Sequence, residues 1–230
     1  MRFRKYGSLV AAAAAAMVAG TAQADTFNLS HGRRYELCRA YEQNLKSFPD
    51  LSSTTHIWPL DSKLSEFRHP EWKSVDALEH LDIVRTMYLW SADPQSKRDD
   101  VAAEDVWKEK AGAVLQEIKS GSVRLDRTRV DFGNDGHLDT VYRYYHPLYA
   151  GAPKDRYGYW YLFFRDGSDE PSSAFRKYSG DMRLYDSFLF RGRFYLMRWD
   201  ILGLNIIEPR SVRAEADIAL IPVCIFGVSK

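Results

Sequence analysis

The sequence predicts an α+β fold in which about three N-terminal helices pack on an antiparallel β-meander of about seven strands. In the first half of the chain, apolar residues recur at three- and four-residue steps, which is the period of a helix. After Gly121 the pattern changes to alternation, and the aromatic residues, 14% of the chain, cluster in this second half. Because helices precede strands, we expect the helices to cover one face of a single sheet.

Three segments of the first half carry a helical stripe. The first contains Cys38 and Tyr41 on one face. The second begins at Ser74, a favourable N-cap residue, and the third ends before Gly121, a typical C-terminal cap. The segments before and after the first helix, 25–33 and 56–73, are predicted to be irregular. The predicted helices span residues 33–45, 74–90 and 103–120.

The second half contains short alternating or wholly bulky runs, separated by turn residues. One pair of runs flanks Arg191-Gly192-Arg193, which predicts a hairpin with a three-residue loop. The predicted strands are 123–126 together with 129–130, 138–145, 157–164, 184–190, 194–199, 204–208 and 218–226.

The N-terminus has the three parts of a secretory signal peptide. Basic residues precede a run of small apolar residues from Leu9 to Ala19, and Ala22-Gln23-Ala24 provides a small-x-small cleavage site. The apolar run is well short of the ~20 residues needed to span a bilayer. We therefore expect a signal peptide at 1–24 and a single mature domain at 25–230, secreted or periplasmic after cleavage near Ala24.

The charge of the mature chain argues against two classes of partner. Cleavage removes Arg2, Arg4 and Lys5, so 29 of the 32 basic residues remain against 31 acidic ones, a net charge of −2. A near-neutral chain lacks the basic surface typical of nucleic-acid binding and the polybasic segment that binds anionic lipid. The sequence also predicts no membrane span.

Two cysteines remain in the mature chain, Cys38 and Cys224. An even number of cysteines in an oxidising compartment predicts a disulfide, here between the first helix and the last strand; two separate buried thiols are the alternative. A redox-active pair is not indicated, because there is no Cys-x-x-Cys motif.

One motif suggests metal chemistry: Asp131-Phe132-Gly133-Asn134-Asp135-Gly136-His137-Leu138-Asp139, between two predicted strands. It resembles the D-x-[DN]-x-D-G-x-x-D loops of secreted FG-GAP and VCBS-type repeats, which bind calcium between β-strands. Calcium takes six to eight oxygen ligands. The resemblance implies that the carboxylates of Asp131, Asp135 and Asp139 and the carbonyl of His137 are the ligands.

The motif departs from that pattern at two places. Position 3 is Gly133, which has no side-chain oxygen, and position 12 is Tyr142 rather than the glutamate of an EF-hand. The alternative is a turn without an ion, since Asn-Asp-Gly favours tight turns and short polar side chains bond their own backbone there. Calcium is thus the single cofactor that the sequence suggests, in a weak site.

The chain as a whole resembles uncharacterised secreted bacterial proteins, through its Cys-x-x-Tyr helix and the segment VDFGNDGHLDTVYRY, and this resemblance implies no mechanism. The sequence contains no Gly-x-Ser-x-Gly or Ser-x-x-Lys motif and no closely spaced histidine pair, so no catalytic residue is predicted. We therefore expect a non-enzymatic binding protein, with a protein partner favoured over a small molecule. A periplasmic inhibitor or immunity protein and a secreted hydrolase with scattered site residues are the alternatives. The sequence does not indicate an oligomeric state.

Overall fold

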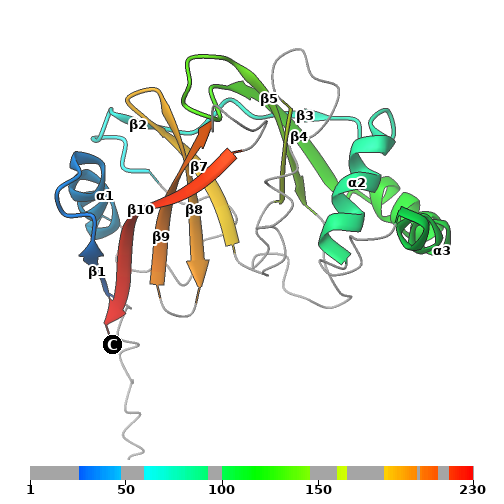
Figure 1. Cartoon of the computed structure of the whole chain (residues 1–230), viewed down its shortest axis with the longest axis horizontal. Helices are drawn as coiled ribbons and strands as arrows, with labels where there is room; N and C mark the ends of the chain where they lie inside the picture. Colours follow the sequence, from blue (N-terminus) through cyan, green and yellow to red (C-terminus); the bar gives the residue numbers. More distant parts are fainter. Residues whose placement is uncertain are drawn as a thin grey trace, which may run out of the picture.

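The computed structural model describes residues 26–47, 60–92, 100–145, 160–164, 184–200, 203–211 and 218–229. These residues form three helices and ten strands, and all strand pairs are antiparallel. The strands belong to two sheets, which Figure 1 shows between α1 at one end of the molecule and α2 with α3 at the other. The predicted signal peptide lies outside the described residues.

The large sheet has six strands in the order β1-β10-β9-β8-β7-β2. Strands β7 to β10 follow one another as a meander, and β1 and β2 form the two edges. Its strands are β1 (Thr26–His31), β2 (Phe67–Arg68), β7 (Leu184–Phe190), β8 (Arg193–Asp200), β9 (Gly203–Ser211) and β10 (Ile218–Ser229).

The small sheet has four strands in sequence order, β3-β4-β5-β6. They are β3 (Lys73–Val75), β4 (Arg124–Val130), β5 (Asp139–Tyr145) and β6 (Trp160–Phe164). The helices are α1 (Glu36–Lys46), α2 (Leu81–Ala92) and α3 (Asp100–Lys119).

Three buried clusters arrange these elements in layers. In the first, α1 packs on one face of the large sheet, where the Tyr41 ring lies 5.2 Å from that of Phe188. The second joins the two sheets, with Val141 of the small sheet and Leu196 of the large sheet among its members. The third places α2 and α3 on the outer face of the small sheet, against Tyr144. The order is therefore α1, large sheet, small sheet, α2 with α3.

The predicted α+β arrangement of three N-terminal helices on one seven-stranded meander is wrong. The described chain is mostly β, it has two meanders in place of one, and the helices are separated by the sheets. The physical reason lies in strand β5, whose side chains are buried on both faces: Val141 packs toward the large sheet and Tyr142 toward the helices. A strand that is apolar on both faces needs a layer on each side, which a single sheet covered on one face does not give.

Two segments predicted as irregular or helical are strands. Residues 26–31 form β1, where the side chains of Phe27 and Leu29 are buried and those of Asn28 and Ser30 are exposed. Ser74, the predicted N-cap, lies in β3 opposite Asp126, so the second helix begins seven residues later than predicted, at Leu81. The hairpin loop between β7 and β8 has two residues, and both Arg191 and Gly192 have positive φ.

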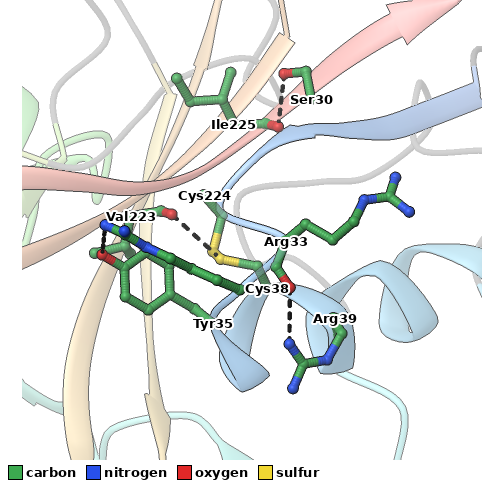
Figure 2. The surroundings of a disulfide bond; sticks show 9 residues. Ser30, Arg33, Tyr35, Cys38, Arg39, Val223, Cys224 and Ile225 are labelled. Carbon is green, nitrogen blue, oxygen red and sulfur yellow. Dashed lines mark hydrogen bonds between the residues drawn. A yellow bond between two sulfur atoms is a disulfide. The ribbon is translucent and has the colours of Figure 1, made fainter.

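The predicted disulfide is confirmed: Cys38 of α1 bonds to Cys224 of β10 across 186 residues (Figure 2). Gly32 gives the chain room to pass this bond. It has a φ of +94°, and a Cβ there would lie 2.2 Å from the Val223 carbonyl oxygen and 2.7 Å from Cys38 Sγ. Ser30 Oγ also donates to the Ile225 carbonyl at 2.9 Å, so α1 and β1 are both tied to β10. None of the described helices is long and apolar enough to cross a membrane.

Candidate functional site

The predicted calcium loop connects β4 to β5, and its carboxylates bind the backbone of the loop itself. The two oxygens of Asp131 accept the N–H groups of Asp135 and Gly136 at 2.8 and 2.9 Å. Asp139 Oδ2 accepts those of Phe132 and Gly133 at 3.0 and 3.4 Å. These bonds fix the turn, in which Gly136 has a φ of +94°.

Asp135 and His137 lie at the exposed tip of this loop. Asp135 Oδ1 accepts the His137 N–H at 3.0 Å, and its Oδ2 accepts the Ser211 hydroxyl of β9 at 2.5 Å. The Ser211 hydrogen bond is the main reason why the pKa of Asp135 is lowered from its ordinary value. The tip is therefore fastened to the large sheet.

Asn134 is the main anchor of the loop. It lies in the left-handed region, with a φ of +51°. Its Nδ2 donates to the carbonyls of Phe194 and Pro209, both at 3.0 Å, and its Oδ1 accepts the Phe194 N–H at 2.9 Å. One side chain of the loop thus satisfies backbone groups of β8 and β9.

Asp139 differs from the other two loop aspartates because it is buried, with 4% of its surface exposed. Burial raises the pKa of its carboxyl to about 6, against the opposing effect of the two backbone N–H groups that it accepts; the nearby charges of Asp135 and Asp131 raise the pKa further. Within the described part of the chain, no group of three or more His, Cys, Asp or Glu side chains is arranged to hold a metal ion. Calcium binding by Asp131, Asp135, Asp139 and the His137 carbonyl remains a prediction from sequence.

A second polar cluster, which the sequence did not predict, lies between the same hairpin and β3. A cavity of about 490 Å³ is lined by six residues, which we call the basic cavity: Glu71, Lys73, Arg127, Thr128, Arg129 and Thr140. Three of the six are cations and one is an anion. Of these six side chains, those of Glu71, Lys73, Arg127 and Arg129 are exposed and that of Thr128 is buried.

Strand register explains why these residues meet. Lys73 of β3 is the cross-strand partner of Arg127, and Arg129 of β4 is the partner of Thr140. Side chains two residues apart in a strand share a face. These four side chains therefore lie on one face of the small sheet, and α2 and α3 cover the other end of that face. The helix-covered end of that face holds apolar side chains, including Leu125.

The opposite face of the same strands is electrostatically balanced. Asp126 is the cross-strand partner of Arg143, and Arg143 Nε donates to Asp126 Oδ2 at 2.8 Å. The Arg143 guanidinium also lies 4.5 Å from the centre of the Trp72 ring. Both charged side chains are largely buried, so this pair belongs to the interior between the sheets.

The sequence contained part of the signal for the basic cavity. Arg129 begins a predicted strand segment, and Arg127 lies two residues before it, outside the predicted range; side chains two residues apart in a strand share a face. Lys73, however, comes from a segment predicted as loop, and its pairing with a residue 54 positions later is a long-range contact. Comparisons with known proteins found no protein family, no curated protein and no solved structure that matches the chain.

Proposed function

We propose that this protein is an exported, non-enzymatic binding protein and that the basic cavity is its ligand site. The observation that carries the proposal is the set of three cations around a cavity of about 490 Å³. This volume falls within the range of small-molecule sites. The proposal replaces the protein partner favoured by the sequence with a small ligand.

Export is supported by two independent features. The N-terminal segment has the composition of a signal peptide, and the Cys38–Cys224 bond is of the kind that persists in oxidising compartments. A test is cell fractionation of the full-length protein in a bacterial host. We expect a mature form that lacks about 24 residues, outside the cytoplasm and without free thiols. An uncleaved cytoplasmic form would contradict export.

A binding function is supported by the chemistry of the cavity. Its lining offers cations, two hydroxyl groups and one carboxylate, which are groups that bind and orient a polar ligand. The six lining residues include neither histidine nor cysteine, so they form no pair of the Ser–His or Cys–His kind that activates a nucleophile.

The test compares the wild type with a variant whose cavity is blocked. It measures the midpoint of thermal unfolding of each protein in the presence of small anions, sugars and amines. A bound ligand raises the midpoint by mass action. We expect at least one compound to raise the midpoint of the wild type and of Gln116→Trp, a control on the exposed surface of α3. Thr140→Trp, which fills the cavity, should lose the response. The bound compound should be recovered unchanged; a converted compound would support the hydrolase alternative.

A further inference from the structure

We infer that the basic cavity binds the oxyanion group, a phosphate or a carboxylate, of a small hydroxylated ligand, held between Lys73 and Arg127. This inference rests on the proposed function and names the ligand class. It begins from strand register: Lys73 and Arg127 are direct cross-strand partners on one face. Like charges in that position destabilise a sheet, so the arrangement is unfavourable unless an anion lies between them.

Several other arginines in the described part of the molecule have carboxylate partners. Arg193 and Arg210 both donate to Glu208, at 2.5 and 2.6 Å. Arg191 donates to Glu36 and Glu66. Lys73 and Arg127, in contrast, form no ion pair with any described residue. Lys73 and Arg127 therefore differ from those arginines, because no described carboxylate neutralises their charge.

The donors of the cavity fit an oxyanion. A guanidinium presents parallel N–H groups that match two oxygens of a carboxylate or phosphate, and an ammonium adds a point charge with three donors. Arg127 and Lys73 supply one of each, and Arg129 lies two residues from Arg127 on the same face.

The remaining lining residues indicate what the rest of the ligand carries. Thr140, the cross-strand partner of Arg129, offers a hydroxyl that can donate or accept. The Glu71 carboxylate, an acceptor when ionised, suits a hydroxyl of the ligand and would repel a second anionic group at its end of the cavity. We infer a ligand with its anionic group at one end and hydroxyl groups at the other.

The test uses calorimetric titration of the mature protein with three probes: inorganic phosphate, gluconate and glucose. Phosphate and gluconate distinguish the two oxyanion chemistries, and glucose is the neutral control. We expect saturable binding of at least one anion. Binding should weaken as salt is added, because exposed charges are screened.

Variants locate the binding. Lys73→Gln and Arg127→Gln should each weaken anion binding roughly tenfold or more, as expected for the loss of a hydrogen bond to a charged group. Arg124→Gln is the matched control: it removes one positive charge from the same strand but on the opposite face, where Arg124 lies 4.9 Å from the centre of the Tyr145 ring. All three positions have exposed side chains, so the variants should fold.

The outcomes separate this inference from the proposed function. No saturable anion binding by the wild type, or equal binding by Arg127→Gln, overturns the inference. A second outcome is that neither anion binds but a neutral compound does, and that Thr140→Trp abolishes this binding. The inferred ligand class would then be wrong, and the proposed function would stand. If no compound binds in a cavity-dependent way, both fail.

Discussion

The β4–β5 hairpin carries the Asp131–Asp139 loop and, with β3, lines the basic cavity, and the two regions use their charged groups in opposite ways. In the loop, Asp131 and Asp139 accept backbone N–H groups of the loop, and Asp135 accepts a hydroxyl from the large sheet. In the cavity, Lys73 faces Arg127 without a described carboxylate partner. The charged residues of a motif can thus be hydrogen-bonded within the fold, whereas charged residues on an exposed strand face can remain available to a ligand.

The largest effect should come from breaking the anchor of the loop with Asn134→Ala. The change removes three hydrogen bonds and leaves two carbonyls and one N–H of the large sheet without their side-chain partner. At about 1 kcal/mol for each bond, we expect the free energy of unfolding to fall by about 3 kcal/mol. Urea denaturation measures it. Gln43→Ala, on the exposed surface of α1, is the control and should change stability by less than about 0.5 kcal/mol. Equal stability of both variants would contradict a structural role for the loop.

The next effect concerns the buried carboxyl of Asp139. Its pKa of about 6 in the folded protein exceeds the ordinary value of 3.8, so the folded state binds this proton more tightly than the unfolded chain. The stabilisation is fully present below pH 4 and is lost as the pH rises through 6. We expect this group to lower the free energy of unfolding by about 2 kcal/mol between pH 4 and pH 8.

Asp139→Asn isolates this contribution, because an amide cannot ionise and its oxygen can still accept the N–H groups of Phe132 and Gly133. Other groups titrate in the same range, including His69, whose pKa is lowered mainly by burial. These groups titrate in both proteins, so their effects cancel in the difference between the free energies of unfolding of variant and wild type. Denaturation at several pH values measures this difference, which should shift in favour of the variant as the pH rises. A constant difference would show that Asp139 does not ionise in this range.

How far the sequence could predict these regions depends on the range of the contacts involved. The disulfide and the strands of the β7–β10 meander could be predicted, because cysteine count and local alternation carry that information. β2 and β3 could not, since they have two and three residues and exist through pairing with distant strands. The basic cavity was missed for the same reason: Arg129 lay in a predicted strand, but Arg127 lay just outside it and Lys73 lay in a segment predicted as loop.

A smaller effect is expected from calcium. An ionised carboxylate has about four lone-pair sites, so the loop aspartates retain acceptor capacity, but an ion would have to compete with the N–H groups that now hold them. For an ion concentration comparable to the dissociation constant, the stabilisation is about 0.4 kcal/mol. Thermal unfolding in millimolar calcium and in a chelator measures the difference. Asp135→Ala should abolish it; a response that persists in this variant would place any bound calcium elsewhere.

The smallest effect has the opposite sign and tests the cavity without any ligand. If Lys73 and Arg127 repel each other across β3 and β4, then Arg127→Gln should stabilise the free protein by about 0.2 kcal/mol at low salt. The gain should shrink at high salt, where the charges are screened. Arg124→Gln removes the same charge without relieving that repulsion and loses a ring contact, so it should be neutral or slightly destabilising.

Precise urea denaturation at two salt concentrations measures the stability of both variants. A variant that is more stable when free and binds phosphate or gluconate less well would show that the fold tolerates an unfavourable charge pair at its ligand site. A loss of stability at both salt concentrations would instead make Arg127 a structural residue, and the contrast between loop and cavity would then fail.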